Sequence, residues 1–147
     1  MCAARMTGPR DPHDSFARMQ NPRNLKVRKE AMRVAVETYH LTATFPGHEL
    51  YGMVSQMRRA SVSIGSNISE GCGRQGDRAM IAYLHQAMGS LDELEFQLEL
   101  AIELGYSRAS DASVLGNALL VTKGMMTRLL ASLRQRVRDH ESRGMGP

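Results

Sequence analysis

The sequence of 147 residues contains no tryptophan, three phenylalanines, four tyrosines and only two cysteines. Cys2 and Cys72 are too few for a disulfide framework, and no Cys/His cluster has the ligand spacing of a zinc site. No segment approaches the roughly 18 consecutive apolar residues of a membrane-spanning helix, and residues 1–10 lack the apolar core of a signal peptide. The sequence therefore predicts a cytoplasmic protein without a membrane partner, and its length fits one domain.

Charge is unevenly distributed along the chain. Residues 1–33 carry eight basic and three acidic side chains, and residues 106–147 carry seven basic and three acidic ones. Residues 77–105 carry one basic and six acidic side chains, and residues 34–76 carry three of each. Such blocks favour complementary packing between elements or subunits, or a basic surface that binds a polyanion such as nucleic acid. Ordinary solvated helix faces are the plain alternative.

What the sequence does contain is typical of helices, because Ala, Leu, Met, Glu and Arg are abundant and apolar residues recur every three or four positions. The predicted helices span residues 24–44, 48–70, 77–104 and 110–139. Four helices joined by short loops predict an all-α fold, an antiparallel up-down four-helix bundle over residues 23–139. Residues 1–22, which are rich in Pro and Gly, are predicted to be a disordered lead-in, and residues 140–147 a disordered tail.

One apolar stripe on each predicted helix is expected to face the core. On the first helix the stripe is Leu25, Met32, Val36 and Tyr39, widened by Ala31, Val34 and Ala35. On the second it is Leu50, Met53, Val54, Met57, Ser61, Ile64 and Ile68, and on the third Ile81, Leu84, Met88, Leu91, Leu94, Leu98, Ala101 and Ile102. On the fourth it is Val114, Ala118, Val121, Met125, Leu129 and Leu133.

The second half of the second helix, from Ala60 to Ser69, consists largely of small residues. Small side chains let another backbone approach closely, so this segment predicts a tight helix-helix contact inside the bundle or between subunits. Charged residues flank it, and each needs a partner if it is buried, because an unpaired buried charge is strongly destabilising. The predicted oligomer interface or ion-pair set is Arg58, Arg59, Ser63, Ser66, Asn67 and Glu70. Direct contact of Arg58 or Arg59 with nucleic acid is the alternative.

Residues 71–76 match the dinucleotide-binding pattern GxGxxG, but that pattern needs a preceding strand and a βαβ unit. Here it follows a helix, so it is interpreted as an interhelical turn. Cys72 has Arg74 nearby, but no histidine is fixed beside it, so a structural thiol is favoured over a reactive one. His85 has no second ligand at i+4 and is interpreted as a packed or surface residue.

Glu95, Glu99 and Glu103 form a stripe of like charge along the third helix. Di-metal carboxylate bundles also carry inward-facing acidic residues, which makes metal binding the alternative function for such a stripe. Like charges at this spacing repel one another unless cations from another helix or subunit lie against them. The stripe is therefore predicted to form salt bridges, and neither a metal nor a cofactor is expected.

Four segments together have a familiar pattern. They are FPGHELYG (residues 45–52), RRASVSIGSNISEGCGR (residues 58–74), GSLDELEFQL (residues 89–98) and LGY (residues 104–106). In this order the chain resembles the four-helix-bundle family of 23S rRNA intervening-sequence proteins, over roughly residues 24–133. The resemblance implies a small four-helix protein that assembles into a ring-like homopentamer, often has a basic surface and has no established enzymatic activity. A distantly similar protein is the accessory factor of diversity-generating retroelements, which binds a reverse transcriptase and nucleic acid.

Two positions depart from the pattern of that family. Arg28 stands where the family commonly has an aromatic residue, which removes a large contact and adds a cation. Gly65 stands where the family has a proline, so close approach is retained but the backbone is less restricted.

The basic ends and the resemblance together predict a non-catalytic, oligomeric protein that binds RNA or another nucleic acid. Few aromatics are present to stack on bases, so phosphate contacts should dominate. The predicted contact residues are Lys26, Arg28, Lys29, Arg33, Arg128, Arg134, Arg136 and Arg138. The alternative is a protein-protein adaptor that docks a retroelement reverse transcriptase. An enzyme is not expected, because no nucleophile, base and oxyanion site converge in the sequence.

Overall fold

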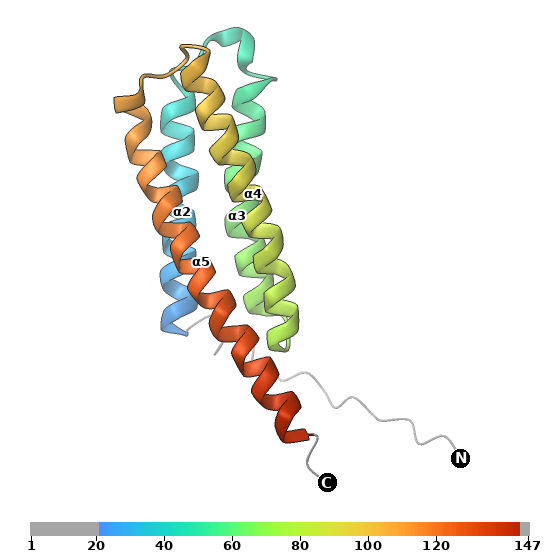
Figure 1. The fold of residues 1–147 in the computed structure, drawn as a ribbon. Helices are drawn as coiled ribbons and strands as arrows, with labels where there is room; N and C mark the ends of the chain where they lie inside the picture. The colour runs from blue at the N-terminus through green and yellow to red at the C-terminus, as the bar shows by residue number, and fades with distance from the viewer. Residues whose placement is uncertain (1–20, 145–147) are drawn as a thin grey trace, which may run out of the picture.

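The computed structural model describes residues 21–144, and every regular element in this range is helical. The elements are α2 (Pro22–Thr42), the short 3₁₀ helix η1 (Gly47–Glu49), α3 (Met53–Gly73), α4 (Asp77–Glu103) and α5 (Ala109–Gly144). Figure 1 shows the four α-helices running alternately in opposite directions. The predicted all-α class and four-helix bundle are therefore confirmed, whereas the ring-like assembly stays a prediction. The predicted lead-in lies outside the described residues except for Asn21 and Pro22.

Each helix packs against two neighbours. Helix α2 contacts α3 and α5, and α4 contacts the same two helices from the other side. Helices α2 and α4 consequently stand at opposite corners of the bundle, and their outward surfaces point in different directions.

The apolar stripes predicted for α3 and α4 do form the core. Met57, Ile64 and Ile68 of α3 are buried, as are Leu84 and Leu91 of α4. At the edges of these stripes Met53, Ile81, Met88 and Ile102 are only partly buried, and Leu50 is exposed. The close contact between α3 and α4 lies inside the bundle. A Cβ added at Gly71 would stand 2.7 Å from Sδ of Met80 and 3.0 Å from Cβ of Tyr83.

The stripe predicted for α2 is wrong in its four large residues, whereas Ala31 and Val34 are buried as predicted. Leu25, Met32, Val36 and Tyr39 are all exposed, by 42% to 66%. The face that packs into the bundle instead consists of Val27, Ala31, Val34, Thr38 and Leu41. Thr38 fits there because its hydroxyl donates a hydrogen bond to the carbonyl oxygen of Val34, at 2.7 Å, so no polar group is left unsatisfied.

The stripe predicted for α5 is wrong in part. Ala118 and Leu133 are buried as predicted, and Met125 and Leu129 pack at the edge of the core. Val114 and Val121 are exposed. The rest of the buried face is Ala112, Leu115, Leu119, Thr122, Met126 and Leu130. The two faces of α5 are adjacent and similarly apolar, so spacing alone favoured a stripe rotated away from the true one.

Helix α3 begins at Met53, later than predicted, because η1 occupies the positions assigned to its first turn. Glu49 then caps α3 from outside the helix, since its Oε2 accepts a hydrogen bond from the Met53 amide at 2.9 Å. The turn between α3 and α4 contains a glycine with a positive φ. Gly76, with a φ of +93°, lies in the turn that links α3 to α4. Of the segment predicted to be an interhelical turn, residues 74–76 form the turn, whereas residues 71–73 are the end of α3. Asp77 is the first residue of α4.

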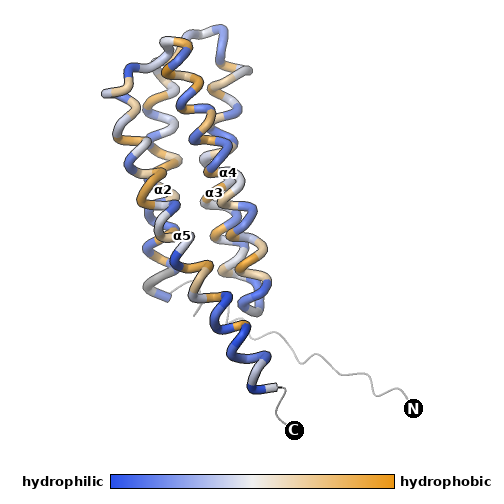
Figure 2. Tube along the Cα trace, in the orientation of Figure 1, coloured by the Kyte–Doolittle hydropathy of each residue, from blue (hydrophilic) through white to orange (hydrophobic). Residues whose placement is uncertain are grey.

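Helix α5 is longer than predicted. It continues through residues 140–144, which were expected to be part of a disordered tail, whereas residues 145–147 lie outside the described range. Its 36 residues correspond to about 54 Å, against about 40 Å for the 27 residues of α4. The C-terminal end of α5 therefore projects past the other helices (Figure 1), and Figure 2 shows that this end is hydrophilic.

Candidate nucleic-acid interface

Four of the predicted phosphate contacts lie on the side of the bundle formed by α2 and α5. Lys26, Lys29 and Arg33 are spaced at i, i+3 and i+7, so they share one face of α2. Lys26 also lines a groove of about 440 Å³ together with Arg128 of α5. We name these four residues the α2–α5 basic cluster.

The cations of the α2–α5 basic cluster are largely unpaired. Within residues 21–144, Lys26, Lys29 and Arg128 form no ion pair. Arg33 lies 3.7 Å from Glu30 of the same helix, and exposed pairs of this kind are weak. The cluster therefore presents positive charge that the described part of the chain does not neutralise.

The arginines near the end of α5 are engaged differently. Arg136 donates two hydrogen bonds to the Asp77 carboxylate, at 3.0 and 2.9 Å. Nη2 of Arg134 lies 2.9 Å from Nε2 of His85, and Nη2 of Arg138 donates to the side-chain oxygen of Gln135. A phosphate would have to compete with a bidentate carboxylate to bind Arg136, whereas Arg134 and Arg138 have only neutral or titratable partners.

Arg28 does not join either group. It follows Lys26 by two positions, which turns it about 200° around α2. Its Nε donates a hydrogen bond to Oγ of Ser69 on α3, at 3.2 Å. Arg28 thus bridges α2 and α3 instead of extending the α2–α5 basic cluster.

The predicted interface set is divided between contacts inside the bundle and the surface. Oγ of Ser63 lies 2.8 Å from Oγ of Ser90 on α4, and the Asn67 amide donates to the Ser63 carbonyl oxygen in the preceding turn. Glu70 forms its ion pair with Arg74, the residue directly after α3, at 2.6 Å, rather than across helices. These residues therefore fix α3 and its contact with α4.

The other members of the set lie toward α2. Arg58 donates a hydrogen bond to Oγ1 of Thr42, and its guanidinium carbon lies 4.5 Å from the ring centre of Tyr39. Arg59 and Ser66 are exposed. The stacking of Arg58 on Tyr39 was missed from the sequence, because Tyr39 was assigned to the core.

The acidic stripe of α4 is neutralised at one end only. Lys123 of α5 bridges Asp92 and Glu95, at 2.9 and 2.8 Å, and hydrogen bonds to these two carboxylates raise its pKa. Glu99 and Glu103 are exposed and form no ion pair with another described residue. Lys123 was not predicted from the sequence as the partner of the acidic stripe, although it lies in the next predicted helix and could supply the cation that the stripe requires.

Metal ligands do not converge in the described part of the chain. Within residues 21–144 no group of three or more His, Cys, Asp or Glu side chains has an arrangement that could hold an ion. The segment from Glu37 to His40 has the sequence Glu-x-x-His, but these two side chains lie 3.9 Å apart on the surface of α2.

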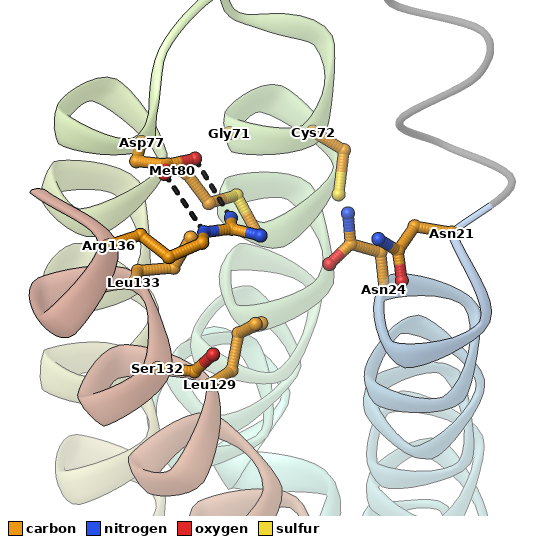
Figure 3. A pocket seen from close by; sticks show the side chains of 10 residues that line it. All are labelled: Asn21, Asn24, Gly71, Cys72, Asp77, Met80, Leu129, Ser132, Leu133 and Arg136. Carbon is orange, nitrogen blue, oxygen red and sulfur yellow. Dashed lines mark hydrogen bonds and ion pairs between the residues drawn. The ribbon is translucent and has the colours of Figure 1, made fainter. Parts of the chain in front are cut away.

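A cavity of about 540 Å³ is lined by the start of α2, the end of α3, the start of α4 and the second half of α5. Figure 3 shows the Asp77–Arg136 pair on one side of it and Asn24 on the other. Cys72 lines this cavity but is 1% exposed, and burial raises the pKa of its thiol although the charge of Arg28 partly opposes the change. Cys72 is thus a poor nucleophile, which agrees with a structural role.

Two of the characteristic segments meet at the opposite end of the bundle. Tyr106 of the LGY segment donates a hydrogen bond to Oε1 of Glu49, at 2.9 Å, and its ring lies 5.8 Å from that of Phe45. Bonds from the Met53 amide and from Tyr106 hold the pKa of Glu49 below its ordinary value. The segments FPGHELYG and LGY therefore join the residues after α4 to η1 and the residues beside it.

Comparisons with known proteins agree with this architecture. A family model described as 23S rRNA-intervening sequence protein matches residues 23–128. A crystal structure from Bacteroides thetaiotaomicron, described as a protein with unknown function from the S23 ribosomal protein family, is similar with a TM-score of 0.69. It is 23% identical, and the match covers 74% of this chain and 98% of that chain, so it shows a common fold. A comparison with curated proteins found no match. No helix in residues 21–144 is long and apolar enough to cross a membrane.

Proposed function

Because this chain belongs to the family of 23S rRNA-intervening sequence proteins, we propose that it is a non-catalytic protein that assembles into a ring of five copies. In this proposal the ring binds RNA, or another nucleic acid, through its basic surfaces. The assembly follows from the resemblance to the family, and the binding from the distribution of cations.

The observation that carries the binding proposal is the α2–α5 basic cluster. Lys26, Lys29 and Arg128 have no acidic partner in residues 21–144. Lys26 and Arg128 line the groove of about 440 Å³, and Lys29 lies three residues after Lys26 on the same face of α2. Phosphates release counterions when they bind such cations, so the affinity should fall steeply with salt. Only three phenylalanines and four tyrosines occur in the chain, which favours contact with phosphates over stacking on bases.

The test compares two exposed arginines with the same change of charge. Arg128→Glu removes a member of the cluster, whereas Arg108→Glu changes a cation in the turn before α5. Fluorescence anisotropy with a labelled structured RNA, at several salt concentrations, gives the slope of log K against log salt. Arg128→Glu is expected to reduce this slope by about 0.7–0.9 for each phosphate that Arg128 neutralises in the wild-type protein, and Arg108→Glu to leave it unchanged. Equal effects of both changes, binding that ignores salt, or no binding at low salt would refute the proposal.

Light scattering after size exclusion tests the assembly. A ring of five copies should have about five times the 16.3 kDa mass of the chain. A monomer would remove the ring from the proposal but would leave the phosphate contacts to be judged by the salt titration.

A second candidate function is an adaptor that docks a retroelement reverse transcriptase. Large apolar side chains on the surface, among them Tyr51 and Met32, favour a protein partner. A gene for a reverse transcriptase and a template repeat beside the gene for this chain would support the adaptor. A gene located within an rRNA operon, together with salt-dependent RNA binding, would support the first function.

A further inference from the structure

Two separate faces hold most of the exposed large apolar residues of the described chain, whereas Leu25 of α2 and Val114, Leu120 and Val121 of α5 lie outside them. The first, which we name the α2–α3 face, consists of Met32, Val36, Tyr39, Leu50, Tyr51 and Val62. Val62 lines two grooves, one of about 350 Å³ with Met32 and one of about 530 Å³ with Tyr39 and Tyr51. Because both grooves share Val62, they form one continuous surface along the seam between α2 and α3.

The second face, which we name the α4 face, consists of Phe96, Leu100 and Leu104. Their spacing of four residues places them in one row along α4. Phe96 is 64% exposed, so most of its ring has no partner in the described chain. Since α2 and α4 stand at opposite corners of the bundle, the two faces point away from each other and cannot meet within one copy.

The charges that border the two faces are opposite in sign. Arg58 and Arg59 border the α2–α3 face. Glu93, Glu99 and Glu103 are exposed on the same helix as the α4 face, within one turn of its apolar row. Apolar surface bordered by complementary charge is typical of two surfaces that bind each other, since charge directs the approach and apolar contact supplies the affinity.

The two faces also reach the same end of the bundle. Tyr39 is in the last turn of α2, and Leu50 and Tyr51 precede α3, so the α2–α3 face extends to the end of the bundle that holds η1. Leu104 follows the last residue of α4, and the bond from Tyr106 to Glu49 fixes that end of α4 beside η1. Two parallel copies placed side by side can therefore bring the faces together without sliding along the bundle axis.

We infer that the α4 face of one copy packs on the α2–α3 face of the next copy. This pairing rests on the assembly proposed above and specifies the surfaces that form it. Because the two surfaces differ, the contact is head-to-tail, and such contacts close into rings when the rotation permits. Pairing of the α2–α3 face with itself would place Arg58 and Arg59 against the same residues of another copy, which like-charge repulsion disfavours. Phe96, Tyr39 and Tyr51 supply the aromatic anchors typical of such interfaces.

The test uses two double variants, each confined to one face. Arg59→Glu with Val62→Glu makes the α2–α3 face acidic, and Phe96→Lys with Leu100→Lys makes the α4 face basic. All four side chains are exposed, so the isolated bundle should fold, which circular dichroism can verify. Arg143→Glu with Val121→Glu, at two exposed residues of α5 outside both faces, makes the same two substitutions as the first variant and is the matched control.

The solution mass of each protein and of their mixture, measured by light scattering and native mass spectrometry, distinguishes the outcomes. Each double variant alone is expected to be a monomer, because its two faces then carry charge of one sign, and the control is expected to keep the wild-type mass. An equal mixture of the two double variants should regain at least twice the monomer mass with both chains present, since every mixed pair offers one native interface.

Three results would overturn the pairing. A double variant that keeps the wild-type mass shows that its face is not part of the contact. A mixture that stays monomeric shows that the two faces do not bind each other. A monomeric wild-type protein refutes both the pairing and the assembly on which it rests, whereas the first two results refute the pairing alone.

Discussion

Replacing glycine by alanine is expected to have opposite effects on stability at two sites, because α3 and α4 approach closely at one of them. Gly71→Ala places a methyl group 3.0 Å from Cβ of Tyr83 and 2.7 Å from Sδ of Met80. Gly116→Ala, within α5, places the same methyl group where no atom beyond its chain neighbours and the adjacent backbone of α5 lies within 4 Å. Both changes remove the flexibility of glycine from a helix, so the packing around the new methyl group is what separates them.

The magnitude depends on which neighbour can move. The Met80 sulfur ends a flexible side chain and borders the cavity of about 540 Å³, so it can rotate away. Cβ of Tyr83 is fixed by the backbone of α4, so relief there requires the two helices to separate. Overpacking of this kind costs about 1–3 kcal/mol, and the helix preference of alanine over glycine returns up to about 1 kcal/mol. We expect Gly71→Ala to be destabilised by up to about 2 kcal/mol and Gly116→Ala to be stabilised by about 0.5–1 kcal/mol.

Urea unfolding followed by circular dichroism measures both free energies, at one protein concentration because assembly shifts apparent stability. If Gly71→Ala proved as stable as Gly116→Ala, the close approach of α3 and α4 at Gly71 would be refuted. A lower midpoint with an unchanged slope would support the packing argument.

Three further outcomes are expected. Leu91→Ala empties a fully buried site and should lower the free energy of unfolding by about 2–5 kcal/mol, whereas Leu120→Ala, at a site that is 69% exposed, should change it by less than about 0.5 kcal/mol in the same urea experiment. Glu49→Gln should lower the melting temperature near neutral pH, and the difference from wild type should shrink as the pH falls below 4.5. The reason is that a carboxylate with a lowered pKa loses its stabilising bonds on protonation. A difference in melting temperature that does not depend on pH would contradict this prediction. The Cys72 thiol should react with a thiol reagent only as fast as the protein opens, so fast labelling of the native protein would contradict its burial.

The number of helices and most of the core of α3 and α4 could be predicted from the sequence, because each of these helices has one dominant apolar stripe. Helix α2 has two. Its exterior stripe contains the large residues Met32 and Tyr39, whereas its interior stripe contains Ala31 and Thr38. Residue size therefore favoured the wrong face, and only the presence of α3 and α5 decides which stripe is covered.

The candidate site was predictable in its residue types but not in its partners. Lys26 and Lys29 could be assigned to one face of α2 from helical spacing alone. Arg136, by contrast, bonds to Asp77, a residue 59 positions earlier in the chain, and no local pattern relates them. Positions of this kind are set by how the helices align, so the sequence identified the cations but not which of them are already neutralised.

The overhang of α5 has a consequence for motion. Residues 138–144 are all exposed, and in that stretch the ion pair between Arg78 and Glu141 is the one hydrogen-bonded link to another described helix. Isolated helical segments shorter than about 12–15 residues are only marginally stable in water. This end of α5 should therefore fray and re-form many times during the lifetime of the folded bundle, so that its amide protons exchange with solvent without global unfolding. A ligand that binds there would reveal itself by slowing that exchange.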